Sequence, residues 1–228
     1  MLTALTPWIL VGGAAAGGQP GGTYVEEFGD GFEDGTGAAW SRIFNSPQFN
    51  TDLPRTGSYA FNIDTDIGNN PYCRINFTDQ AEIYGRNYFR IDSTDMTDGN
   101  NLQLVTILNA FGFRAKINIG SSSGVLRLTA DTSGLVGGAG GEISLGTWHR
   151  LEYRYVDETS EGAADGIMQV RLDGATVIDI QNHKAGAGGT VNRVHFGSFQ
   201  RIGTYNIELH LDDFSVGTGG WPGGDGGG

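Results

Sequence analysis

The chain of 228 residues has a single cysteine, only two lysines and no long apolar run. One thiol cannot form an internal disulfide, and its presence leaves the redox compartment open, so we expect Cys73 to be a small buried hydrophobic residue. No segment approaches the roughly 18 uninterrupted apolar residues of an ordinary membrane span. The sequence therefore predicts no membrane partner.

Positive charge is also scarce, because 14 Lys and Arg residues face 26 Asp and Glu residues, giving a formal net charge of −12. A nucleic-acid backbone calls for a clustered basic face, and none is visible in the sequence. We therefore expect no nucleic-acid partner. The acidity suits solubility and would also suit the binding of divalent cations.

Short alternating apolar and polar segments fill the middle of the chain, and no segment longer than a turn has the helical period. A length of 228 residues is compatible with one β-sandwich, and 39 glycines without a collagen-like repeat indicate many turns. Asp173-Gly174 is a typical hairpin turn. The predicted strands are Tyr24 to Phe28, Tyr59 to Asp64, Tyr84 to Ile91, Leu102 to Leu108, Arg114 to Ile119, Val125 to Ala130, Trp148 to Val156, Met168 to Leu172, Thr176 to Ile180, Arg193 to Phe196 and Ile207 to Leu211.

The two ends differ in composition from this middle part, which predicts a domain over residues 23–217 between two arms. Residues 1–22 begin with an apolar piece and continue in Gly and Ala, and residues 218–228 are rich in Gly. The apolar piece fits a signal peptide poorly, because no Lys or Arg precedes it and Pro7 interrupts it. Gly-rich segments order only when something holds them, so we predict that the arms serve assembly. The expected anchors are Trp8, Ile9, Leu10, Val11 and Trp221.

Several motifs, in this order along the chain, resemble the concanavalin A-like lectin and laminin-G-like superfamily. They are the first-strand region Glu26 to Gly35, Gly57 to Phe61, the strand Leu145 to Tyr153, the hairpin Gly166 to Gly174 and the last strand Leu211 to Val216. The resemblance implies an all-β, two-sheet antiparallel jelly-roll sandwich. It does not define a ligand, because this fold carries many functions.

The same resemblance suggests two kinds of catalytic pattern, and the sequence matches neither. Glycan hydrolases need two carboxylates on one strand face, whereas Asp157-Glu158 with Glu161 fall in a polar loop and are expected to be solvated. Polyuronate lyases of this fold use Arg, Gln, His and Tyr on adjacent strands, and His183-Lys184-Ala185-Gly186 matches only a fragment of their last motif. His149 is expected to face solvent. We therefore predict that the chain is not an enzyme.

Calcium is the one cofactor with a sequence argument. Strict alternation after Leu211 would point Asp213 inward, so either a β-bulge resets the phase at Asp212-Asp213 or a carboxylate is partly buried there. In several members of the superfamily a last-strand aspartate holds a structural Ca²⁺. The resemblance implies Asp213 with Glu33 or Asp34 as ligands.

Three functions follow from these observations. The preferred one is a non-enzymatic structural or decorating protein of a virion, in contact with copies of itself or with other virion proteins. The second is a secreted or surface lectin-like module that binds glycans, with Tyr84, Tyr88 and Phe89 as a stacking platform. The third is a glycan lyase or hydrolase.

Overall fold

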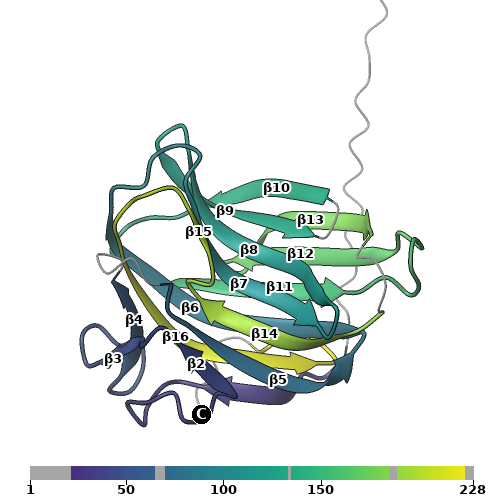
Figure 1. The fold of residues 1–228 in the computed structure, drawn as a ribbon, viewed down its shortest axis with the longest axis horizontal. Coiled ribbons are helices and arrows are strands. Elements are labelled where there is room, and N and C mark those ends of the chain that lie inside the picture. Colours follow the sequence, from purple (N-terminus) through teal and green to yellow (C-terminus); the bar gives the residue numbers. More distant parts are fainter. Residues whose placement is uncertain (1–21, 65–69, 133–134, 185–188, 224–228) are drawn as a thin grey trace, which may run out of the picture.

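The computed structural model describes residues 22–64, 70–132, 135–184 and 189–223, and in these ranges the chain is all β. Two antiparallel sheets pack face to face as a jelly-roll sandwich, as predicted (Figure 1). No helix forms in these ranges, so this part of the chain contains no helix that could cross a membrane.

Sheet A has β6 and β16 at its centre. Its strands run in the order β13 (Ala175–His183), β12 (Gly166–Leu172), β11 (His149–Val156), β6 (Glu82–Thr94), β16 (Ile207–Thr218), β4 (Ala60–Asp64) and β3 (Gln48–Asn50), and β1 (Val25–Asp30) also pairs with β16.

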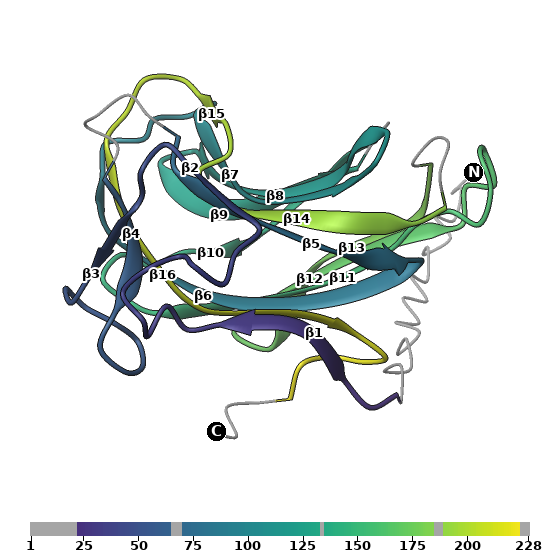
Figure 2. The same ribbon diagram turned by 60° about the horizontal axis from the view of Figure 1, so that its bottom comes forward.

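Sheet B covers the other side of the core. Its order is β10 (Leu135–Glu142), β9 (Val125–Thr132), β8 (Gly112–Ser122), β7 (Asn101–Asn109), β14 (Val191–Gly197), β5 (Tyr72–Gln80) and β2 (Arg42–Phe44), and β15 (Arg201–Ile202) pairs with β7. Figure 2 shows the two layers from the side, with sheet B above sheet A.

The core lies between the sheets because alternate residues of each strand point inward. Aromatic rings join the two layers: Phe196 of sheet B lies 4.9 Å from Phe214 of sheet A, and Trp40 lies 4.9 Å from the same Phe214 ring. Gly85 leaves room for the ring of buried Tyr153, since a Cβ there would lie 2.1 Å from a Tyr153 ring carbon. Cys73 is free and fully buried, as predicted.

All eleven predicted strands are present, with ends shifted by at most three residues except in β16, which continues past the predicted end at Leu211 to Thr218. Asp173 and Gly174 both have positive φ, of 52° and 87°, which fits the predicted tight turn between β12 and β13. The sequence did not predict β2, β3, β5, β10 or β15. Four of these five are short or glycine-rich, and β5 has bulky side chains on both faces, so its alternation is weak.

The phase break in the last strand is a β-bulge. The register with β6 shifts between Asp212 and Ser215, and Asp213 has a φ of 47°. Phe214 and Val216 can therefore return to the core after the break. Asp212 is the fully buried carboxylate, and Asp213 is only half-buried.

The predicted anchors of the N-terminal arm, Trp8 to Val11, lie outside the described residues. The described start of the C-terminal segment lies against the outer face of sheet A. There the Trp221 ring lies 5.5 Å from Tyr84, and the Arg171 guanidinium lies 3.7 Å from the centre of the Trp221 ring. Trp221 thus packs against its own sandwich, and its role in assembly stays a prediction.

Candidate active site

A row of polar side chains crosses the outer face of sheet B. Residues directly opposite one another in an antiparallel ladder share a face, and their chain neighbours, such as Cys73 and Phe196, fill the core. Six strands that lie side by side in Figure 1 each contribute one member. From β2 to β9 the row is Arg42, Arg74, His195, Thr106, Lys116 and Asp131.

His195 lies in the middle of this row, against two aromatic rings. Its ring centroid is 4.7 Å from that of Phe199 and 4.9 Å from that of Tyr72, and the residue is only 6% exposed. Burial, with the charges of Arg193 and Arg74, lowers the pKa of His195 to about 4. Neither ring nitrogen has a hydrogen-bond partner within the described residues. His195 is therefore neutral near pH 7 and can accept a proton, and both of its ring nitrogens are buried.

Tyr72 is the neighbouring acid. It precedes Arg74 by two residues on β5, so both side chains lie on the outer face. The ring stacks on Phe44 at 4.3 Å and meets the edge of Phe199 at 5.0 Å. Burial raises the pKa of the Tyr72 phenol despite the nearby Arg74 and Arg42. The phenol therefore carries its proton at neutral pH and can donate it.

Arginines from three strands surround this pair: Arg42 on β2, Arg74 on β5 and Arg193 on β14. Arg42 lies over the Phe44 ring at 4.5 Å and Arg74 over the same ring at 5.6 Å. Arg193 donates from Nε to Asn76 Oδ1 at 3.1 Å. In the described part of the chain none of the three arginines forms an ion pair with a carboxylate, although the protein as a whole is acidic. Such arginines are suited to bind a carboxylate of a ligand.

On the β8 side of the row the polar side chains already bind one another. Lys116 Nζ lies 3.3 Å from Asp131 Oδ2, and Asn118 donates to the same oxygen at 3.2 Å. Buried Gln103 donates to Gln200 Oε1 at 2.7 Å, which fixes its amide at the edge of the face. This side presents a fixed polar surface.

Three residues that sequence analysis placed in solvent are buried. His149 is 5% exposed and its Nδ1 lies 2.8 Å from Asp173 Oδ2, so it links β11 to the β12–β13 turn. The expectation for Asp157 and Glu158 was also wrong, since both are buried and Asp157 lies 3.5 Å from Arg114. His183 lies on sheet A against Tyr155, far in the topology from the polar row on sheet B.

The predicted calcium ligands are brought into one region, and each carboxylate already has protein partners. Asp213 accepts from Arg55 Nη1 at 2.6 Å and from Thr56 Oγ1 at 2.8 Å. Glu33 accepts from the Ser58 amide at 2.7 Å. Asp34 instead accepts from the amide and hydroxyl of Thr36, two residues along the chain. Calcium binding at Asp213 stays a prediction.

The expected aromatic platform does not form. Phe89 points into the core, Tyr84 is covered by Trp221, and Arg55 stacks on Tyr88 at 3.3 Å.

No family model and no curated sequence matches the chain. Solved structures with similar folds include an endo-β-1,4-glucuronan lyase from the fungus Trichoderma reesei, with a TM-score of 0.60 and 13% identity over 85% of this chain and 96% of the other. An alginate lyase from a Chlorella virus has a TM-score of 0.54 and 11% identity over 82% and 96%. Domain 4 of an extracellular arabinanase from Geobacillus stearothermophilus, solved with arabinotriose, has a TM-score of 0.56 and 13% identity over 86% and 94%.

These similarities confirm the jelly-roll sandwich and contradict the predicted function. The solved structures that share this fold include polysaccharide lyases and an arabinanase domain, and none of them supports a virion or capsid role. The prediction of a non-enzymatic decorating protein is therefore wrong, because similar structures include several polysaccharide lyases. The virion role rested on the composition of the two arms. The prediction that the chain is not an enzyme rested on motif searches along the sequence, whereas the polar row forms only across strands.

Sequence reasoning did not identify Tyr72, Arg74, Arg193 or His195 as site residues. Their signal was present in the two segments Tyr72-Cys-Arg74-Ile and Arg193-Val-His195-Phe, in which reactive polar residues alternate with apolar ones. Alternation places each pair on one face, but only the pairing of β5 with β14 brings the two pairs together.

Proposed function

We propose that this protein is a lyase that cleaves polysaccharides containing 4-linked uronic acids by β-elimination on the outer face of sheet B. The observation that carries the proposal is the contact of neutral His195 with protonated Tyr72, beside the unpaired Arg74. A base, an acid and a carboxylate-binding cation are the three groups that this reaction needs.

The arginines would bind the uronate carboxylate. The proton on C5 of a uronic acid is weakly acidic because removing it places negative charge next to a carboxylate. A guanidinium paired with that carboxylate offsets the charge that develops in the transition state. Arg74 is directly opposite His195 in the ladder, and Arg193 is two residues before His195 on the same face, so both are placed for this role.

The two titratable groups would then move the protons. His195 takes the C5 proton, and the electron pair of the broken C5–H bond forms the C4=C5 double bond as the C4–O4 bond breaks. The Tyr72 hydroxyl donates its proton to the leaving O4. The reaction consumes no water and produces one unsaturated and one saturated chain end. Proton exchange with solvent returns His195 and Tyr72 to their starting forms.

The rest of the row would bind the chain on either side of the cleaved bond. Six strands at about 4.8 Å spacing place Arg42 and Asp131 about 24 Å apart, enough for several sugar rings. Arg42 and Phe44 offer cationic and stacking contacts on one side. Lys116, which is partly exposed beside Asp131, offers a hydrogen bond on the other.

The test is a panel of glucuronan, alginate and polygalacturonate, with turnover followed by the ultraviolet absorbance of the new double bond conjugated to the carboxylate. We expect turnover of at least one polymer. His195→Gln and Tyr72→Phe should each lower kcat by roughly 10²–10⁴-fold. Arg74→Gln should lower kcat and raise KM together.

The matched controls are Tyr84→Phe and Arg154→Gln, which change the same residue types on the outer face of sheet A and should leave turnover unchanged. Turnover that survives His195→Gln would refute the assigned base. If the protein binds a polyuronate but forms no double bond in any polymer, it is a glycan-binding module and not a lyase.

A further inference from the structure

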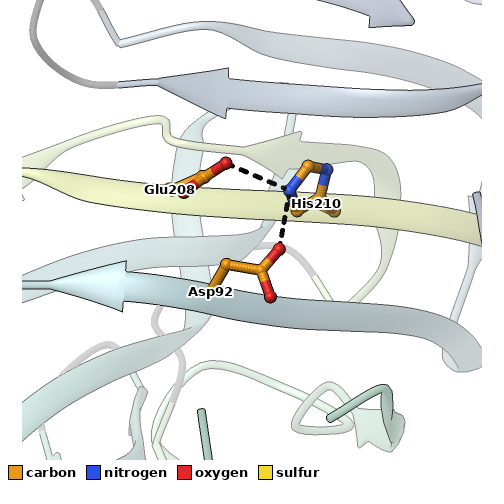
Figure 3. A group of neighbouring side chains, drawn as sticks. All are labelled: Asp92, Glu208 and His210. Atoms are coloured by element: carbon orange, nitrogen blue, oxygen red, sulfur yellow. Dashed lines mark ion pairs between the residues drawn. The ribbon is translucent and has the colours of Figure 1, made fainter. Parts of the chain in front are cut away.

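A second polar cluster lies on the outer face of sheet A, where β6 and β16 pair. Glu208 and His210 share this face because they are two residues apart on β16. The register shifts between Glu208, which pairs with Ser93, and Leu209, which pairs with Ile91, so Asp92 is the extra residue of a bulge. Figure 3 shows the three side chains converging across the two strands.

Imidazole Nε2 is the centre of the cluster. It lies 3.1 Å from Asp92 Oδ2 and 3.8 Å from Glu208 Oε1, and the candidate ligand atoms all lie within 4.8 Å of one another. Tetrahedral Zn²⁺ with nitrogen and oxygen ligands at about 2.05 Å places its donor atoms about 3.4 Å apart. The observed separations bracket this value, so small side-chain shifts would complete the geometry.

The same atoms lack satisfactory partners within the protein. His210 is 1% exposed, and neither of its ring nitrogens makes a hydrogen bond within the described residues. The geometry toward Asp92 Oδ2 is that of an ion pair, and this oxygen also makes no hydrogen bond there. Asn62 is directly opposite His210 on β4, and its side-chain oxygen is also buried without a hydrogen-bond partner in the described residues. Buried polar atoms without partners are costly, and a bound cation would satisfy the acceptors.

Neighbouring groups hold the carboxylates in place. Arg90 donates from Nε to Asp92 Oδ1 at 2.7 Å, which leaves Oδ2 directed at His210. The Ser93 hydroxyl lies 3.4 Å from Glu208 Oε2, leaving Oε1 for the cluster. Contacts of this kind orient the ligands of metal sites. Glu208 is half-exposed, so an ion can enter from solvent.

We propose that Asp92, Glu208 and His210 bind one divalent transition-metal ion, with Zn²⁺ as the best match to one imidazole and two carboxylates. The ion would tie β6 to β16, the two central strands of sheet A. Because the cluster lies on the face of the sandwich opposite the candidate active site, the metal would stabilise the fold and take no part in cleavage. The proposal is independent of the proposed lyase activity.

The experiment uses the full chain after treatment with a chelator and its removal. Titration with Zn²⁺ by calorimetry should give one site per chain, and thermal unfolding should show a higher Tm with Zn²⁺ than without it. Co²⁺ in place of Zn²⁺ should give visible absorption bands typical of nitrogen and oxygen ligands. Ca²⁺ at the same concentration should not displace Zn²⁺, since Ca²⁺ prefers six or more oxygen ligands.

Variants test whether Zn²⁺ binds at this cluster and not at carboxylates elsewhere in the chain. Glu208→Gln changes an exposed residue and should fold normally, yet lower Zn²⁺ affinity by at least tenfold; Asp92→Asn should do the same. Glu161→Gln, an exposed carboxylate elsewhere, is the matched control and should bind like the wild type. No saturable binding, or equal binding by Glu208→Gln, Asp92→Asn and the wild type, would overturn the proposal.

Discussion

Replacing His195 by Gln should show two separate effects of this residue: its effect on the free energy of unfolding and its role in the reaction. In the folded protein burial and two arginines lower the pKa of His195 from 6.5 to about 4. Between these pH values the unfolded chain binds a proton that the folded chain does not. The folded state therefore loses stability as the pH falls through this window, and the loss is absent above about pH 7.

The size of the effect follows from the two pKa values. At 1.36 kcal/mol per pKa unit, acidification from pH 7 to pH 4 should cost about 3 kcal/mol through His195 alone. Gln does not titrate, so the variant should lack this contribution. Compared with the wild type, its free energy of unfolding should therefore fall less on acidification, by about 3 kcal/mol.

Urea unfolding of both proteins at several pH values between 4 and 7.5 measures this difference. The lyase assay on the same samples should show turnover only in the wild type, with activity retained until the pH approaches 4, where His195 becomes protonated. If the two proteins lose stability equally on acidification, His195 is not a buried neutral base, and the reasoning that assigns it the C5 proton fails.

Three further predictions concern Asp212, Asp213 and Trp221. Burial and neighbouring Asp213 raise the pKa of Asp212 from 3.8 to about 7, so Asp212 should contribute a loss of stability as the pH rises from about 4 to 7, opposite in sign to the contribution of His195; in urea unfolding, Asp212→Asn should therefore lose more stability than the wild type on acidification. If calcium binds at Asp213, a chelator should lower Tm and Asp213→Ala should abolish the response, whereas no response would leave the bulge held by hydrogen bonds alone. Trp221→Ala should lower the free energy of unfolding by about 2 kcal/mol by uncovering Tyr84, and a change in sedimentation would show an added role in assembly.

The fold could be predicted because its signals are local. Alternation in segments such as Leu151 to Tyr155 and the turn at Asp173-Gly174 depend on neighbouring residues only. The bulge at Asp212-Asp213 was also visible, as a break in that alternation. Short or glycine-rich strands such as β10 have no such pattern, because pairing with β9 decides their conformation.

The candidate site could not be predicted because it depends on strand order. His195 and Tyr72 are more than a hundred residues apart, and they meet only because β14 pairs with β5. The burial of His149 likewise depends on Asp173, which the β12–β13 turn brings to the end of β11. A motif search along the chain looks for fixed spacing, which a jelly roll does not require.

The central claim is β-elimination, and the structure of the cleaved chain ends tests it most directly. Mass spectrometry and proton NMR of oligosaccharides released from a polyuronate by the wild type should show a C4=C5 double bond at the new non-reducing end, in a product one water lighter than a hydrolysis product. Saturated ends, or a polymer left intact by the wild type, would contradict the account.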